Sequence, residues 1–434
     1  MAWHSLTFCH DFIYARGMWF DRLLKLEPAE RTAVLWSFSY FFCLLSAYYI
    51  LRPVRDAMGI AGGVENLQWL FSATFIAMLL AVPVYGWATR YFSRHRLLPV
   101  VYGFFIVNLV LFYALFTLQL APSWTARAFF VWLSVFNLFV VSVFWSFMAD
   151  VFSQAQAKRL FGVIAAGGSA GAIAGPAITA LLSVALGTAQ LLLISAGLLV
   201  VAIVCIHQLV GWVDQNSRDA AGHVHDAPLG GGILAGFRLL WRSPYLLGIG
   251  LYILLYTCLA TFLYFEQAHI VKAAFDNSAE RTRLFASIDL LVNVLTVMTQ
   301  LLITSRLVDR FGLSVTLVII PLLMAVGFML LGASPVLVVL VVFQIIRRAG
   351  NYAIAKPARE MLFTVLTREE KYKAKNVLDT VVYRGGDALS GWLFAGLMAI
   401  GTGLPGVAFI GAILAILWAV NGWWLGKRCI TNSS

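Results

Sequence analysis

Five charged side chains close together in the chain could bind an anion inside a membrane. They interrupt apolar runs long enough to be membrane-spanning helices, and they are Arg347, Arg348, Lys356, Arg384 and Asp387. A charge near the centre of a bilayer costs about 2.5 to 3.5 kcal/mol on insertion scales, so such side chains are expected to face a solute pathway or one another. Because most of them are cationic, they predict a transporter for a polar, anionic solute.

The first of these cations share one face of a predicted helix. Arg348, Tyr352 and Lys356 are spaced four residues apart, which places them in one stripe. If this span begins near Val336, Arg347 lies about 16 Å deep, where its side chain reaches the interface poorly. Arginine can grip a phosphate or carboxylate with two parallel hydrogen bonds. We therefore predict that Arg347, Arg348, Tyr352 and Lys356 bind the substrate.

The next predicted span carries a similar group. Arg384 and Asp387 are three residues apart, and Asp379 precedes Asp387 by eight residues on the same helical face. We predict that Arg384 binds substrate and that the two acids couple or gate transport. An alternative remains open, in which Arg384 and an acid form an internal salt bridge.

The first predicted span ends in the charged sequence RPVRD. Arg52 and Asp56 are four residues apart, so they could pair, and Pro53 predicts a kink or a break in the helix. Either this is the outer end of the helix, with arginines reaching lipid headgroups, or it is the cationic wall of an outer vestibule. We predict that Arg52 binds substrate and that Arg55 and Asp56 act in gating.

Two acids lie inside spans of the second half. Glu266 occupies the place in the seventh span at which the first span carries basic residues, so it could close an outer gate or relay a proton. Asp289 lies roughly two turns into the eighth span. It is predicted either to act in coupling or to serve as a structural hydrogen-bond acceptor.

The composition requires a membrane protein. Of the 434 residues, 61% are hydrophobic and 12% charged, with a mean hydropathy of +0.86. A soluble domain carries about 25% charged residues. At about 20 to 25 residues per span, the chain accommodates roughly twelve helices. We expect an all-α membrane protein with these spans: 32–60, 66–89, 96–118, 126–149, 160–184, 188–212, 244–271, 283–304, 313–332, 336–357, 373–400 and 404–426.

The spans form two halves that repeat. Lys158 and Lys375 occupy equivalent short loops, each about ten residues before a glycine pair in the next helix. Two six-helix halves in parallel repeat are typical of the major facilitator architecture, whose site lies between the halves. The expected division is an amphipathic cytoplasmic segment at 1–31, a bundle at 32–212, a linker at 213–243, a second bundle at 244–426 and a tail at 427–434.

Basic residues predict the orientation. Most Lys and Arg lie before the first span, in the loops after even-numbered spans and in the tail, so both termini are expected to be cytoplasmic. The net charge of +11 would then face anionic membrane lipid, and nucleic acid is not an expected partner. No cleaved signal peptide is evident. We expect a monomer in the plasma membrane.

Nothing in the sequence indicates an enzyme or a bound cofactor. The five cysteines are scattered without a CxxC pair, and His223 and His225 form an isolated HxH, so we expect no metal site. No nucleophile–base pair and no phosphate-binding glycine loop occur.

Several stretches resemble the bacterial and plastid ATP/ADP translocase family. They are YYILRPVRD from Tyr48, FWSFMADVFSQAQAKRLFGVIAAGGSAGAIAG from Phe144, YFEQ into VKAAF from Tyr264, and KPAREMLFTVLTREEKYKAKNVLDTVV from Lys356.

The resemblance implies a divergent bacterial member of the major facilitator type, located in the inner membrane, that exchanges nucleotides. It matches Glu266 to the family's acid in the seventh span and Asp150 to an acid at the end of the fourth, so Asp150 joins the gating candidates. A family lysine falls on or beside Phe71, and another has Arg384 or Asp387 as its counterpart.

The predicted function is secondary active transport of a nucleotide or related phosphorylated anion by alternating access. Exchange of one such anion for another is one mode that this function allows. One alternative is a proton-coupled transporter of another anionic or amphipathic solute. An alternative from another class is a non-transporting membrane scaffold or sensor.

Overall fold

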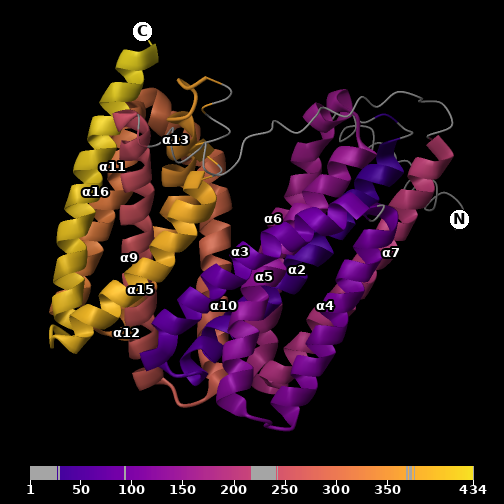
Figure 1. Ribbon diagram of the computed structural model, residues 1–434, viewed down its shortest axis with the longest axis horizontal. Coiled ribbons are helices and arrows are strands. Elements are labelled where there is room, and N and C mark those ends of the chain that lie inside the picture. The colour runs from indigo at the N-terminus through magenta and orange to yellow at the C-terminus, as the bar shows by residue number, and fades with distance from the viewer. Residues whose placement is uncertain are drawn as a thin grey trace, which may run out of the picture.

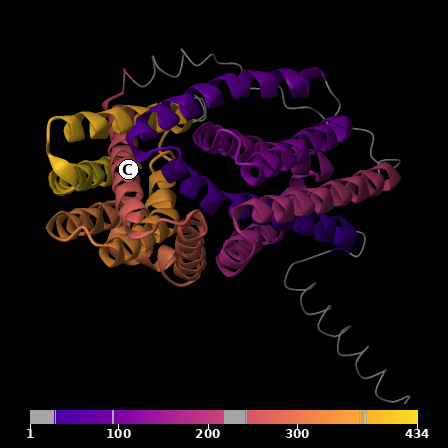
Figure 2. The same ribbon diagram turned by 90° about the horizontal axis from the view of Figure 1, so that it is seen from below.

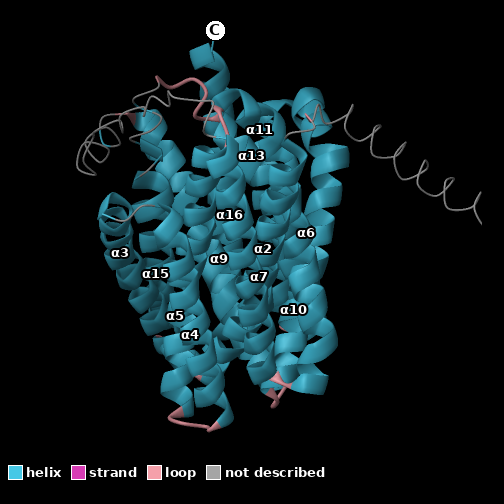
Figure 3. Cartoon of the chain, turned by 90° about the vertical axis from the view of Figure 1, so that its right-hand side faces the viewer, coloured by secondary structure: helices cyan, strands magenta, loops and turns pink. Residues whose placement is uncertain are grey.

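A computed structural model describes residues 27, 30–91, 94–216, 241, 243–367, 370, 374–375 and 377–433. Throughout these residues the chain is helical with short loops, and Figure 3 shows no strand among them. The expected amphipathic segment at 1–31 and the linker at 213–243 lie mostly outside the described residues. The His223 and His225 pair also lies outside them.

Six long helices form the first half of the molecule. A 3-10 turn, η2 (Val64–Asn66), leads from the first helix into the second. The six are α2 (Arg31–Ala61), α3 (Leu67–Tyr91), α4 (Arg94–Thr117), α5 (Pro122–Val151), α6 (Gln154–Leu186) and α7 (Thr188–Asn216).

The second half repeats this layout, but π-helical turns interrupt two of its spans and end a third. The α-helices are α9 (Pro244–Ala274), α10 (Ser278–Thr299), α11 (Ser305–Ala333), α12 (Leu337–Gly350), α13 (Lys356–Met361), α15 (Tyr383–Ala399) and α16 (Gly403–Ser433). The π-helical turns are η4 (Gln300–Thr304), η5 (Asn351–Ala355) and η6 (Leu378–Val382).

The helices match the expected number of spans. Within the described residues, 11 helices are long and apolar enough to cross a membrane. The remaining expected span is η6 with α15, where the α-helical part has only 17 residues and Asp379, Arg384 and Asp387 lower its hydropathy. The protein is therefore a multi-span membrane protein with an all-α fold.

Local sequence determines where several helices begin. Ser153 caps α6 and forms a capping box with Gln156, which satisfies two backbone donors at the helix start. At the start of α9, Ser243 caps the helix and Pro244 occupies its first turn, where the missing N–H is not needed. In contrast, α2 continues unbroken through Pro53, so the break that this proline could cause is absent.

The helices pack into two bundles, which lie side by side in Figure 1 and Figure 2. In the first bundle α2 contacts α6 and α7, and in the second α11 contacts α16 while α9 contacts α15 and α16. Glycines allow the close approach of α6 to α2, since a Cβ at Gly175 would lie 2.7 Å from the Ser46 carbonyl oxygen. We call the end of the molecule at which α2 begins the Arg31 end, and the end at which α2 finishes the Ala61 end.

The two halves are joined at the Ala61 end. There α10 contacts α2 and α6, and α15 contacts α3. The rings of Trp69 and Trp392 lie 4.6 Å apart across this contact. The Lys272 ammonium lies 2.9 Å from a Glu65 carboxylate oxygen of the opposite half. The hydrophobic core of the second half also continues into this end of the first half.

Toward the Arg31 end, ion pairs connect helices of the same half. Arg159 at the start of α6 pairs with Glu30 at 2.9 Å. In the second half, Lys375 pairs with Glu360 at 2.5 Å. Figure 1 shows the two bundles diverging in this direction. The contacts between the halves therefore close one end of the molecule and leave charged clusters at the other.

Candidate functional site

Three adjoining chambers lie between the halves, and Tyr352, Tyr383 and Arg384 line all of them. The deep chamber, of about 190 Å³, is lined from both halves toward the Ala61 end. The C-half chamber, of about 520 Å³, is lined mostly from the second half and includes Lys356. The N-half chamber, of about 340 Å³, is lined mostly by α2 and α5. Together they make a central cavity at the place predicted for the site.

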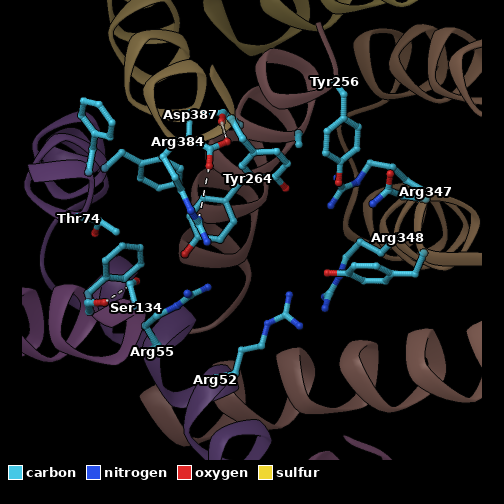
Figure 4. A pocket seen from close by; sticks show the side chains of 18 residues that line it. Arg52, Arg55, Thr74, Ser134, Tyr256, Tyr264, Arg347, Arg348, Arg384 and Asp387 are labelled. Atoms are coloured by element: carbon cyan, nitrogen blue, oxygen red, sulfur yellow. Dashed lines mark hydrogen bonds and ion pairs between the residues drawn. The ribbon is translucent and has the colours of Figure 1, made fainter. Parts of the chain in front are cut away.

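Arginines from three spans converge on the deep chamber. Figure 4 shows their guanidinium groups directed toward a common space. Arg52 and Arg55 come from α2, Arg347 and Arg348 from the end of α12, and Arg384 from α15. The sequence placed these residues in membrane spans, and the structure brings all five together.

One buried carboxylate joins two of these arginines. Asp289 of α10 is 1% exposed and lies 2.5 Å from Arg348 Nη2 and 3.7 Å from Arg52 Nε. Arg52 belongs to the first half, so Asp289 links the halves electrostatically. One carboxylate cannot neutralise two guanidinium groups. The site therefore keeps a positive excess around Asp289.

The pairing of Arg52 with Asp56 that their spacing suggested is not among the ion pairs of the described residues. Asp56 is held by its neighbour Arg55, at 2.8 Å, and accepts a hydrogen bond of 3.1 Å from the Tyr264 hydroxyl. Tyr264 lies on α9 of the other half. This contact therefore fits the predicted gating role of Arg55 and Asp56, because it must break if the halves separate here.

Arg347 is held by an uncharged partner. Its Nε and Nη2 donate to Oε1 of Gln344 at 3.2 and 2.9 Å, and Gln344 Nε2 in turn donates to Gln267 Oε1 of α9. Burial of this arginine against an amide fixes its geometry without cancelling its charge. Its guanidinium can therefore interact strongly with an anion in the deep chamber.

Arg384 forms the internal ion pair that one of the two alternatives predicts, and it also faces the chambers. Its Nη1 lies 3.7 Å from Asp387 Oδ2, which is an internal ion pair. Asp387 also accepts a hydrogen bond of 3.5 Å from Thr261. However, the Arg384 side chain is 38% exposed and lines all three chambers, so its charge remains accessible to a ligand.

The remaining predicted cation lies nearer the Arg31 end. Lys356 is exposed and lines the C-half chamber beside Arg359. Arg359 is buried and pairs with Asp379 at 3.2 Å. Asp379 therefore helps to hold the wall of this chamber.

Four of the predicted acids do not line the chambers: Asp56 and Asp289, described above, and Glu266 and Asp150. Glu266 is 1% exposed on α9, and its two carboxylate oxygens have no hydrogen-bond partner in the described part of the structure. Asp150 is exposed near the end of α5.

The cavity has the chemistry of a site for an anion with several negative charges. Its deep chamber is lined by five arginines and one acid, Asp387. Paired arginines bind phosphate oxygens through several directed N–H donors, and the low-dielectric surroundings strengthen that attraction. Among the described residues, no three His, Cys, Asp or Glu side chains are grouped to hold a metal ion.

Comparison with known proteins agrees with this chemistry. The family described as TLC ATP/ADP transporter matches residues 114–430, which is most of the chain. The chain belongs to the TLC ATP/ADP transporter family. The resemblance seen in the sequence motifs is thereby confirmed.

Curated relatives of this TLC family member span nearly its whole length. ADP,ATP carrier protein 1 of Chlamydia muridarum is 22% identical, with 95% of this chain and 91% of the relative covered. ADP,ATP carrier protein 1 of Chlamydia pneumoniae is 21% identical, with 95% and 94% covered.

Solved structures of transporters share its fold. A bacterial homologue of the iron transporter ferroportin, in an inward-facing state, has a TM-score of 0.65 at 13% identity, covering 92% of this chain and 99% of that one. The nucleoside transporter NupG has a TM-score of 0.62 at 14% identity, covering 92% and 100%. These likenesses confirm the predicted major facilitator-type fold.

Several polar and aromatic side chains of the cavity were not predicted from the sequence. Asn137 interrupts the apolar fourth span, and an amide inside such a run is a signal that could have been used. Tyr256 precedes Tyr264 by eight residues and so shares its helical face. Trp418 of α16 gave no signal, because an aromatic residue in an apolar run is usual.

Proposed function

We propose that this TLC family member is a secondary active transporter that exchanges nucleotides, ATP against ADP, across the membrane by alternating access. The observation that carries this proposal is the convergence of five arginines from both halves on one chamber. A di- or triphosphate supplies the several negative charges that such a cluster requires. The printed names of the Chlamydia relatives, ADP,ATP carrier proteins, favour the same substrate.

The arrangement of contacts suggests how the exchange proceeds. We infer that the Arg31 end faces the cytoplasm, because the Lys- and Arg-rich loops lie there. A nucleotide then enters from the cytoplasm while the Ala61 end is closed by contacts such as Glu65 with Lys272. Its phosphates compete with Asp289 for Arg52 and Arg348, which weakens the link between the halves and permits them to rock.

We also infer the oligomeric state of the protein and its location in the cell. A single chain encloses the whole cavity, so one copy suffices for transport and we expect a monomer. We also infer that it lies in a bacterial inner membrane with both termini in the cytoplasm, and the multi-span fold supports a place in a membrane. Basic residues at that face are expected to contact anionic lipid.

Exchange in liposomes tests this function. Purified protein is reconstituted with ADP inside, and uptake of labelled ATP is measured against liposomes without internal nucleotide. We expect uptake only with internal ADP, and at least a tenfold loss of uptake in Arg348→Ala and in Arg384→Ala. Arg283→Ala is the matched control, since Arg283 is exposed on α10 and lines none of the three chambers. Normal exchange by both cavity variants would refute the site.

A second candidate rests on Glu266. A buried carboxylate without a hydrogen-bond partner is a candidate proton carrier, which favours proton-coupled transport of an anion. In that case a pH gradient alone, without internal nucleotide, would drive uptake. Glu266→Gln would then abolish the gradient-driven uptake. Uptake that ignores the gradient and requires internal ADP would exclude this candidate.

A further inference from the structure

The chambers differ in size and chemistry, and the difference suggests how a nucleotide is oriented. The deep chamber, at about 190 Å³, is smaller than the roughly 300 to 1,000 Å³ of most small-molecule sites. The C-half chamber, at about 520 Å³, falls within that range. The small arginine-lined chamber can hold a phosphate chain, and the larger one has room for a nucleoside.

Aromatic faces surround the larger chamber. The rings of Tyr256 and Tyr383 lie 6.1 Å apart, and those of Tyr256 and Trp418 lie 5.7 Å apart. Tyr352 extends from η5 into the same space, and it also lines the deep chamber. A planar base can stack on such rings, and this contact is strong for every nucleobase because each has a π-face.

Two asparagines add groups that can distinguish one base from another. Asn137 of α5 and Asn351 of η5 line the C-half chamber from opposite halves. The structure gives neither side-chain amide a hydrogen bond within the described part of the chain, although Asn351 is 9% exposed. An amide that faces the chamber and has no protein partner can donate to and accept from a ligand there.

We propose that the nucleotide lies with its phosphates in the deep chamber and its adenine base stacked on Tyr352 and Tyr383, where Asn137 and Asn351 read the base edge. This rests on the proposed function. An asparagine amide matches adenine well, because its oxygen accepts from N6–H while its nitrogen donates to N7. The two asparagines come from different halves, so a bound adenine also bridges the halves.

Binding measurements on the intact detergent-solubilised protein test the orientation. Dissociation constants are measured for ATP, GTP, UTP and tripolyphosphate, the last being a phosphate chain without a base. Wild-type protein should prefer ATP to GTP and UTP and should also bind tripolyphosphate. Asn137→Ser and Asn351→Ser should each lose roughly tenfold in ATP affinity. Asn137→Ser should leave tripolyphosphate affinity unchanged, because Asn137 does not line the deep chamber, whereas Asn351 lines both chambers.

Stacking is tested separately at Tyr352. Tyr352→Leu should weaken ATP roughly tenfold or more without affecting tripolyphosphate, while Tyr352→Phe keeps the ring and the ATP affinity. Asn108→Ser is the matched control, because Asn108 lies on α4 and bonds its own helix. Unfolding temperatures without ligand show that each variant is folded.

The outcomes separate this inference from the proposed function. If wild-type protein binds neither ATP nor tripolyphosphate, the nucleotide function fails and the orientation fails with it. If wild-type protein binds ATP, but the asparagine variants keep the preference over GTP and UTP, only the orientation is refuted. A Tyr352→Leu variant that loses tripolyphosphate affinity as much as ATP affinity also refutes it.

Discussion

Among the individual residues of the site, one buried carboxylate has the central place, because it balances the charges of two arginines. Asp289 is buried between Arg52 and Arg348, two guanidinium groups that would otherwise repel each other in a poorly solvated space. Burial makes each charge expensive, and the arrangement is stable only while the opposite charges remain paired. In the proposed mechanism, a bound nucleotide would replace part of the negative charge that Asp289 supplies.

Removing the negative charge of Asp289 should therefore destabilise the protein. Asp289→Asn keeps the shape but leaves two uncompensated arginines, so we expect the free energy of unfolding to fall by about 3 to 5 kcal/mol. A second substitution, Arg52→Gln, should recover part of this loss. Thermal unfolding of the single and double variants in detergent measures both effects. Equal stability of Asp289→Asn and wild-type protein would contradict the proposed balance.

Which residues carry charge into the membrane could be predicted from sequence, but their partners could not. Arg52 was within reach of Asp56 by helical spacing, yet its carboxylate partner is Asp289, more than 200 positions away. Pairing across the halves depends on how α2 and α10 are packed. That information is absent from the periodicity of any single helix.

At the scale of the element, π-helical turns change how the second half presents its side chains. The stripe formed by Arg348, Tyr352 and Lys356 was predicted for a regular α-helix, but η5 interrupts it between Gly350 and Lys356. A π-helical turn holds more residues than an α-helical turn. The residues after it are therefore rotated about the helix axis relative to their positions in a regular α-helix. Accordingly Arg348 lines the deep chamber, and Lys356 lines the C-half chamber.

Close packing of α6 on α2 gives a second test at this scale. A Cβ at Gly175 would lie 2.7 Å from the Ser46 backbone oxygen, whereas one at Gly197 would meet no atom within 4 Å. Gly175→Ala should therefore lower the free energy of unfolding by about 1 to 3 kcal/mol, since α2 must shift. Gly197→Ala, in the middle of α7, should leave it unchanged or raise it slightly. Thermal unfolding compares the two, and similar effects of both would contradict the packing.

At the scale of the whole molecule, the halves are closed at one end only. The number of spans, their approximate positions and the two-half division could be predicted from hydropathy and the repeat, because both are local properties. The closed end could not, since it depends on pairs such as Glu65 with Lys272 and Trp69 with Trp392 that form only when the bundles dock.

Reversing charges at the closed end tests its role in transport. Lys272→Glu places two negative charges opposite each other, so it should weaken the closed end and slow ATP/ADP exchange several-fold. Combining it with Glu65→Lys restores an attractive pair and should restore exchange. Exchange in liposomes measures this, and a double variant that is no better than the single one would show that the pair does not join the halves functionally.

The central claim is that the arginine-lined cavity binds nucleotides, and thermal stabilisation by ATP and ADP tests it most directly. A ligand that binds only the folded state stabilises it by about 2.7 kcal/mol at 100 times its dissociation constant. We predict that both nucleotides raise the unfolding temperature of the wild-type protein and of Arg283→Ala, less so at high salt. We predict no shift for Arg348→Ala. A nucleotide shift that persists in Arg348→Ala, or no shift in the wild-type protein, would contradict the claim.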